Sequence, residues 1–262
     1  MIEEIERPMG NFGEKRKIRI YKPDGLVNQT DIRLPVLYMH DGQNLFYDTD
    51  ATYGVSWGMR EALYETKLPM IVVGIDCNHE GHRRFDEYSP FVNKDIGMQL
   101  YALDQPLGGQ GDVYVDWLVR ELKPWIDLHY PTNPEHTIIA GSSMGGLISL
   151  YAAIRHPHVF RRVGAISNAF WFCQDQLEEL VRTSEFPAIE RLYMDIGTKE
   201  ATGPFGNASY ISSNQRIYDL LKMKLSTNQL RFEIVEDGIH NEQSWRERLP
   251  NILRDLYSLT WK

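Results

Sequence analysis

Short apolar runs alternate with amphipathic stretches along the chain. The apolar runs at residues 35–40, 70–75 and 137–140 are typical of strands buried on both faces of a sheet, and further strands are predicted at 163–167, 192–196 and 230–235. Apolar residues at helical spacings predict helices at residues 55–68, 112–130, 147–154, 175–183, 215–225 and 243–257. Residues 15–22 alternate isoleucine with charged residues, which predicts a half-exposed strand.

This alternation of strands and helices predicts an α/β fold. We expect a doubly wound, mostly parallel sheet with helices on both faces, formed by a single domain over residues 1–262. Sheets of this kind bind ligands at the carboxyl ends of their strands, so a functional site is expected in the loops there. Residues 77–111 form a long, polar and aromatic connection, and a loop of this length is usually functional.

A glycine- and serine-rich turn joins the strand at 137–140 to the helix at 147–154. It reads G-S-S-M-G over residues 141–145, a G-x-S-x-G sequence in the strand–turn–helix context of a nucleophile elbow. Such a turn holds its central serine at a helix N-terminus, where free N–H groups favour negative charge. The turn could also be a plain connection, but its context favours Ser143 as a catalytic nucleophile.

A serine nucleophile needs a general base and a carboxylate that orients the base, and on this fold the acid and then the histidine follow the serine. His240 fits this order, although a lone loop histidine is more often a surface residue. Asp195 and Glu200 are both candidates for the acid. Asp195 lies within the strand at 192–196, where it could be a structural carboxylate. Glu200 lies beyond the strand end, on a loop that can reach His240, so we favour Glu200.

The oxyanion formed during ester cleavage needs backbone N–H donors. One is expected from Met144, which follows the nucleophile, and a second from the loop after an earlier strand. The loop that follows residues 35–40 fits, because Gln43 can supply the N–H and Gly42 allows the backbone to approach closely.

Composition narrows the possible partners. A net charge of −8 without a basic stripe argues against binding to nucleic acids or anionic membranes. The 2 cysteines, Cys77 and Cys173, lack metal-ligand spacing and are expected to be buried thiols. The amino terminus has no apolar stretch typical of a signal peptide, and no run reaches the length of a membrane span. We therefore expect a cytoplasmic protein, and the sequence leaves its oligomeric state open.

With these residues in hand, the chain resembles the putative-esterase group of α/β-hydrolases. That group includes enterochelin esterases, feruloyl and acetylxylan esterases of carbohydrate esterase family 1, esterase D and mycolyltransferases. The resemblance rests on residues 38–44, 141–146 and 197–200, and on His240 followed by Trp245. It implies an α/β-hydrolase fold and a serine esterase without metal or cofactor. It also supports Glu200, because the acid of the group ends a Gly-Thr-x-Glu/Asp segment. Two further segments, at 75–87 and 167–171, look most like the enterochelin-esterase branch.

We therefore expect a serine carboxylesterase that forms an acyl-enzyme on a small-molecule ester. An acyltransferase of the same fold and a catalytically inactive binding protein on this scaffold are the alternatives. Arg83 and Arg84 lie among aromatic residues, and Trp171 lies in a second aromatic loop, which favours aromatic esters such as catecholate or hydroxycinnamoyl esters. Alternatively, Arg84 pairs with Glu87 one turn away and only braces the loop.

Overall fold

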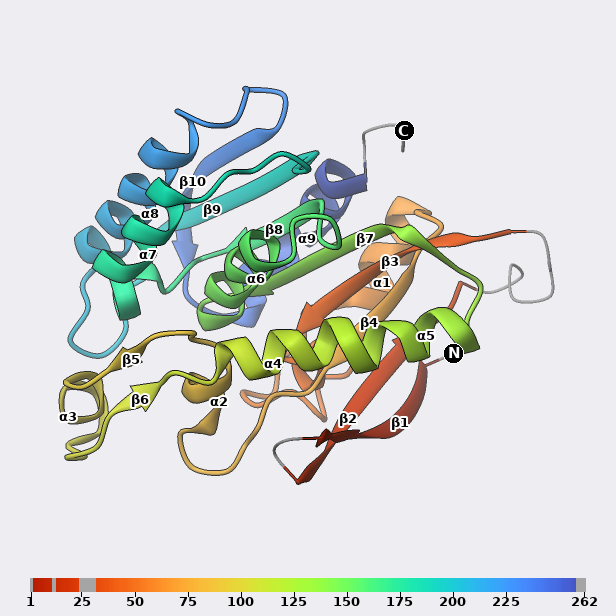
Figure 1. Cartoon of the computed structure of the whole chain (residues 1–262), viewed down its shortest axis with the longest axis horizontal. Helices are drawn as coiled ribbons and strands as arrows, with labels where there is room; N and C mark the ends of the chain where they lie inside the picture. Colours follow the sequence, from red (N-terminus) through yellow and green to blue (C-terminus); the bar gives the residue numbers. More distant parts are fainter. Residues whose placement is uncertain (1, 11–12, 24–31, 258–262) are drawn as a thin grey trace.

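The computed structural model describes residues 2–10, 13–23 and 32–257. It is built on an eight-stranded sheet with the strand order β1-β2-β4-β3-β7-β8-β9-β10 (Figure 1). The last six strands of this order are parallel to one another, while β1 and β2 add an antiparallel edge. The strands are Ile2–Met9 (β1), Glu14–Tyr21 (β2), Leu34–His40 (β3), Ile71–Ile75 (β4), Thr132–Ser142 (β7), Arg162–Ile166 (β8), Arg191–Lys199 (β9) and Leu230–Ile239 (β10).

Helices cover both faces of the sheet, and each face has its own hydrophobic core. On one face, helices α4 to α8 bury side chains such as Leu118, Leu147 and Leu177. On the other face, α1 and α9 pack against each other and bury Leu63 and Leu253. These helices are Met59–Thr66 (α1), Gly111–Trp117 (α4), Lys123–His129 (α5), Met144–Arg155 (α6), Gln174–Thr183 (α7), Asn207–Leu221 (α8) and Glu242–Tyr257 (α9). The structure therefore confirms the predicted fold.

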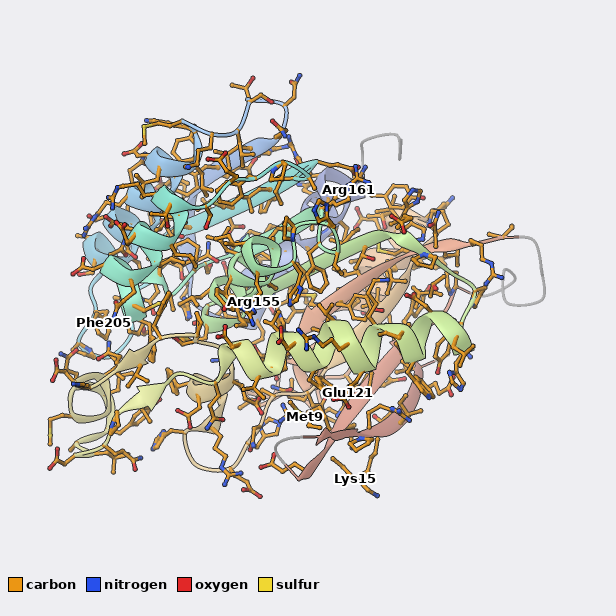
Figure 2. All side chains as sticks on the ribbon, viewed as in Figure 1. Met9, Lys15, Glu121, Arg155, Arg161 and Phe205 are labelled. Atoms are coloured by element: carbon orange, nitrogen blue, oxygen red, sulfur yellow. The ribbon has the colours of Figure 1, made fainter. Side chains whose placement is uncertain are left out.

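The apolar composition of the central strands explains why they are parallel and lie in the middle of the sheet. Every residue of β3, β4 and β8 is buried, so these strands are covered by helices on both faces. The edge strand β10 instead alternates exposed and partly buried residues, and Ile234 remains half exposed. Figure 2 shows that side chains fill the space between the sheet and its helices. Within the described residues, every helix is too short or too polar to cross a bilayer.

The structure departs from the sequence prediction in several elements. Strand β1 was not predicted, because its residues mix glutamate and arginine with few apolar ones, yet it pairs with β2 along its whole length. Helix α8 begins at Asn207 rather than at residue 215, since the residues before 215 are mostly polar and hide the helical period. The predicted helix at 112–130 is α4 continued through a π-helical turn at Leu118–Leu122 into α5.

The long connection at 77–111 contains short elements instead of an irregular loop. They are the helices Arg83–Glu87 (α2) and Ile96–Tyr101 (α3) and a two-stranded sheet of Val92–Asn93 (β5) and Leu107–Gly108 (β6). Figure 1 shows this segment at one end of the molecule, beside the ends of α7 and α8. Because β3, β4, β7, β9 and β10 are parallel, their carboxyl ends meet at one edge of the sheet. The loops that carry the candidate site residues therefore lie together.

Candidate active site

Ser143 occupies the turn between β7 and α6 in a strained backbone conformation. Its φ of 58° and ψ of −121° lie in a region that costs an L-amino acid on the order of 1–3 kcal/mol. The turn is held in place by neighbouring backbone: the Ser143 N–H donates to the Ile166 carbonyl at 2.9 Å, and its carbonyl accepts from Gly146 N–H at 3.1 Å. A Cβ on Gly141 would lie 2.8 Å from the Gly145 carbonyl carbon, so strand and helix meet more closely than any side chain allows. This is the geometry of a nucleophile elbow.

His240 and Glu200 meet where two neighbouring strands end. Glu200 follows β9 and His240 follows β10, and His240 Nδ1 lies 2.5 Å from Glu200 Oε2. An ionised carboxylate can only accept a hydrogen bond, so Nδ1 donates and Nε2 is left free to accept a proton. The imidazole lies between the rings of Tyr210 and Trp245, with centroids 5.1 and 5.2 Å away. These contacts hold the imidazole in one tautomer and one orientation.

Glu200 is fully buried and is nevertheless held in its charged form. Its Oε1 accepts hydrogen bonds from the Gly197 N–H at 2.7 Å and from the Ser167 hydroxyl at 2.6 Å. Burial alone would raise the pKa of Glu200, but the hydrogen bond and charge of His240, with those from Ser167 and Gly197, lower the pKa below its usual value. These partners therefore favour the charged form of Glu200.

Asp195, the other candidate acid, lies in a different environment. It is fully buried within β9 and forms an ion pair with Arg248, whose Nε lies 2.8 Å from Asp195 Oδ2. It also accepts the Ser167 N–H at 3.0 Å and the Tyr193 hydroxyl at 3.1 Å. The structure therefore brings Glu200 against His240 and places Asp195 among other partners.

The backbone of the β3–α1 loop is fixed beside the elbow. Asp41 adopts a left-handed conformation with φ of 56°, and residues Gly42–Asn44 form a single 3₁₀ turn (η2). The Gln43 side chain ties this turn to the next strand end, since its Oε1 accepts the Cys77 N–H at 3.1 Å. Gln43 lies in the first turn of η2 and Met144 in the first turn of α6, so neither N–H has an acceptor within its own helix. Both groups are oriented by helical turns next to Ser143.

A cavity of about 470 Å³ lies over these residues. Ser143, His240 and Gln43 contribute to its wall, together with polar and aromatic side chains from loops far apart in sequence. Those further residues include Asp41, Asn44, Tyr53, Cys77, His79, His82, Arg84, Phe85, Tyr101, Glu242 and Trp245. Its size is within the range of small-molecule binding sites.

Arg84 lies in the wall of this cavity and is already paired. Its Nε and Nη2 donate to the two carboxylate oxygens of Asp41, each at 2.7 Å. This arrangement corrects the alternative in which Arg84 braces the loop through Glu87, because Glu87 pairs with Arg16 instead. Burial opposes the charge on both partners, but the pairing lowers the pKa of Asp41 and raises that of Arg84.

The other two residues expected at the substrate lie elsewhere. Arg83 is half exposed, forms ion pairs with Glu14 and Glu80, and is not among the residues that line the cavity. Trp171 stacks on Phe205 with ring centroids 3.9 Å apart and lines a separate, more open depression beside β5. Of the three residues, the structure brings only Arg84 to the cavity.

The sequence did not assign a role to several residues near the site. Ser167 lies in the segment 167–171 that carries part of the family resemblance, but nothing there indicates its contact with Glu200, and Arg248, which contacts Ser167, belongs to no motif. Glu242 lies in the cavity wall, where its Oε1 accepts the Asn44 side-chain amide at 3.1 Å. In the sequence, only the position of Glu242, two residues after His240, indicates that it could belong to the site.

Both cysteines are free and buried, as predicted. Burial raises the pKa of the Cys173 thiol to about 12, and it also raises the pKa of the Cys77 thiol. Burial therefore disfavours the thiolate form of both cysteines. Among the described residues, no group of three or more histidine, cysteine, aspartate or glutamate side chains is arranged to hold a metal ion.

The arrangement of strands, helices and elbow defines the α/β-hydrolase fold. The crystal structure of an IroE-like serine hydrolase from Shewanella oneidensis matches it with a TM-score of 0.81 at 21% identity, over 98% of this chain and 80% of that chain. The enterobactin esterase FES from Shigella flexneri, solved in the presence of enterobactin, matches with a TM-score of 0.74 at 21% identity. That match covers 98% of this chain but only 59% of FES.

Sequence comparison identifies the family. The model of the family described as "Putative esterase" matches residues 10–256, so the chain belongs to this family of ester hydrolases. The chain is also 24% identical to the uncharacterized protein YbbA of Bacillus subtilis (strain 168) over 247 residues, which is 92% of each chain.

Proposed function

We propose that this protein is a serine carboxylesterase that works through an acyl-enzyme. The observation that carries the proposal is the buried Glu200–His240 pair at the edge of the cavity that also contains the strained Ser143. Glu200 orients the imidazole, so that Nε2 is the group available to take the proton of Ser143. A single catalytic site accounts for two observations: Ser143 and His240 line one cavity although they come from different loops, and Glu200 is held against His240.

The reaction proceeds in two halves. As the Ser143 oxygen bonds to the ester carbonyl carbon, its proton passes to His240 Nε2 and the carbonyl becomes an oxyanion. Collapse of this intermediate breaks the ester bond, and the departing alkoxide takes the proton from His240. Water then attacks the acyl-enzyme in the same way, with His240 again as base, and releases the carboxylic acid and Ser143.

The oxyanion is stabilised by the N–H groups of Met144 and Gln43. Each is in the first turn of a helix, and the side chain of Gln43 is anchored at the end of β4 through Cys77. A donor fixed before the reaction needs no reorganisation as the charge develops, and each contributes on the order of 3 kcal/mol in the transition state.

We further propose that the substrate is an ester with an aromatic, hydroxyl-bearing group. The cavity wall contains Phe85, Tyr101 and His82, with the His82 and Tyr101 ring centroids 4.1 Å apart. Among the described residues, Asp41 engages Nε and Nη2 of Arg84, which leaves Nη1 for a ligand. Because the Arg84 charge is already balanced by Asp41, a phenolic or catecholic hydroxyl suits this position better than a free carboxylate.

Chromogenic ester hydrolysis tests the proposed function. Wild-type protein should release p-nitrophenol from p-nitrophenyl acetate, and a folded Ser143→Ala variant should lose at least about 10³-fold in kcat. Circular dichroism and the melting temperature establish that the variant is folded. Turnover by Ser143→Ala close to the wild-type rate contradicts the assignment.

The substrate class is tested by two adjacent arginines. Arg84→Ala should lower kcat/KM for a dihydroxybenzoyl or feruloyl ester by about tenfold relative to a short alkyl ester, because a ligand contact to the guanidinium is lost. Arg83→Ala is the matched control and should leave this ratio unchanged, since Arg83 pairs outside the cavity. Preference for the alkyl ester in the wild type, or an unchanged ratio in Arg84→Ala, would rule out this substrate class.

A further inference from the structure

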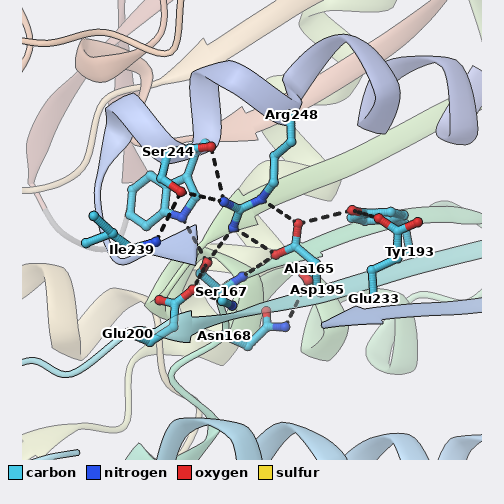
Figure 3. A network of polar contacts seen from close by, with 12 residues as sticks. Ala165, Ser167, Asn168, Tyr193, Asp195, Glu200, Glu233, Ile239, Ser244 and Arg248 are labelled. Atoms are coloured by element: carbon cyan, nitrogen blue, oxygen red, sulfur yellow. Dashed lines mark hydrogen bonds and ion pairs between the residues drawn. The ribbon is translucent and has the colours of Figure 1, made fainter. Parts of the chain in front are cut away.

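Beside Glu200 lies a cluster of polar side chains that the catalytic steps above do not use (Figure 3). Ser167, in the loop after β8, is fully buried and contacts Glu200, Trp245 and Arg248 through its hydroxyl oxygen. Arg248 comes from α9 on one face of the sheet and reaches both Ser167 and Asp195. The cluster therefore connects α9, the loop after β8 and β9 to the acid.

The hydrogen bonds of Ser167 have only one possible direction. Its oxygen lies 2.9 Å from Trp245 Nε1 and 2.7 Å from Arg248 Nη2, and both nitrogens can only donate. These two donors occupy both lone pairs of the hydroxyl. Its proton must therefore point to its remaining neighbour, Glu200 Oε1, at 2.6 Å.

This direction determines how Glu200 meets His240. Oε1 accepts the Ser167 hydroxyl and the Gly197 N–H, while Oε2 accepts His240 Nδ1. The carboxylate is thus held on one oxygen by two donors and presents the other oxygen to the imidazole. Rotation of the carboxylate away from His240 would break both bonds to Oε1.

Arg248 is held by groups that do not touch the triad. Its Nε and Nη2 donate to the two oxygens of Asp195 at 2.8 and 3.1 Å, and its Nη1 donates to the Ser244 carbonyl at 3.1 Å and hydroxyl at 3.0 Å. Asp195 in turn accepts the Ser167 N–H and the Tyr193 hydroxyl. A planar guanidinium can reach Asp195 and Ser167 at once, which the single ammonium of a lysine cannot do in the same geometry.

We propose that Ser167 and Arg248 are positioning residues for the triad acid: Arg248, fixed by Asp195, directs the Ser167 hydroxyl onto Glu200 and so keeps its other oxygen on His240. The inference rests on the proposed esterase function, and it assigns the second acid candidate, Asp195, to the support of Glu200. Neither Ser167 nor Arg248 lines the cavity, so neither touches the substrate.

The proposal predicts a change in catalysis that loss of stability does not produce. Ser167→Ala removes a donor from Glu200, and Arg248→Gln removes the group that directs this donor. In both variants the charged form of Glu200 is less favoured, so the acid limb of the pH profile of kcat/KM should move to higher pH. We expect kcat for p-nitrophenyl acetate to fall by about 10- to 100-fold per active site, with KM nearly unchanged. Active sites are counted by labelling with a fluorophosphonate.

Arg191→Gln is the matched control. Arg191 pairs with Asp255 at the start of β9, at the opposite end of the strand from Glu200, and is buried to a similar extent as Arg248. The Arg191→Gln substitution should lower the melting temperature, while kcat per labelled site and the pH profile stay as in the wild type. Arg248→Lys retains the positive charge but replaces the planar guanidinium with a single ammonium group. Its pH profile should therefore resemble that of Arg248→Gln.

The proposal is overturned if Ser167→Ala has the wild-type kcat and an unchanged acid limb in its pH profile. It is also overturned if the control Arg191→Gln shows the same pH shift as Ser167→Ala. If Ser167→Ala does not fold, the same two readings in Arg248→Gln decide the question. Failure of the underlying function is separately visible, because wild-type protein would then show neither turnover nor fluorophosphonate labelling.

Discussion

His240 and Glu200 show how neighbouring groups restrict a side chain to one role. Glu200 is buried and ionised because its two oxygens together accept three hydrogen bonds, and His240 is held in one tautomer because its Nδ1 faces that carboxylate. The elbow motif and the chain order were enough to predict Ser143, His240 and Glu200 as candidates. The ion pair of Arg84 with Asp41 could not be predicted, because it joins residues 43 positions apart that meet only in the folded chain.

Replacement of the two acids should separate their roles. Glu200→Gln should lower kcat on the order of 10³-fold with little change in melting temperature, because the amide no longer stabilises the imidazolium or selects its tautomer. Asp195→Asn leaves Arg248 without its counter-charge and should destabilise the fold by about 3 kcal/mol, with only about a tenfold fall in kcat. Steady-state kinetics and urea denaturation measure the two effects. The reverse result, with activity abolished in a stable Asp195→Asn and a mild effect of Glu200→Gln, would assign the triad acid to Asp195.

At the scale of elements, the site depends on close approaches of backbone that only glycine allows. A Cβ on Gly42 would lie 2.6 Å from the carbonyl carbon of Gly74, so η2 and β4 cannot keep their separation with any other residue. The fully apolar strands were predictable from sequence, because a strand buried on both faces carries a strong signal. Strand β1 and the first turns of α8 were not predictable from sequence. They lie at the surface, where polar residues obscure the hydrophobic periodicity of a strand or a helix.

Gly42→Ala should displace η2, which carries Gln43, the second donor of the proposed oxyanion hole. A shift of Gln43 by about 1 Å is expected to cost about 10²-fold in kcat, since the second N–H donor no longer faces the oxyanion. Gly206→Ala is the control, because no atom lies within 4 Å of a Cβ at this position. As Gly206 is the N-cap of α8, the control should cost at most about 1 kcal/mol in stability and leave kcat unchanged. Equal kcat in Gly42→Ala and the wild type would remove Gln43 from the proposed oxyanion hole.

At the scale of the whole molecule, the parallel sheet brings loops from distant parts of the sequence to one edge. The same packing buries a titratable group, His40, at the end of β3. Its Nδ1 pairs with the Tyr114 hydroxyl at 2.8 Å, and its Nε2 has no hydrogen-bond partner among the described residues. Burial lowers the pKa of His40 from 6.5 to about 3, with a smaller opposing effect of Asp41 and a further lowering by Arg84.

This buried histidine should make the fold sensitive to acid. Between pH 6.5 and about 3, the unfolded chain binds a proton at His40 that the folded chain does not, so stability falls as the pH falls through this range. The contribution is at most about 1.4 kcal/mol per pH unit. The free energy of unfolding, measured in urea as a function of pH, should therefore depend less on pH in His40→Gln than in the wild type. Parallel curves for the two proteins would show that His40 binds protons equally in the folded and unfolded states, which would contradict the lowered pKa.

The central claim is that Ser143 is the nucleophile of a serine esterase, and covalent labelling tests it most directly. The protein is treated with a fluorophosphonate, and the modified residue is located by intact-mass and peptide mass spectrometry. The account predicts one label per chain, on Ser143, with parallel loss of ester hydrolysis and no labelling of a folded Ser143→Ala variant. A label on another serine, or full inhibition without modification of Ser143, would contradict it.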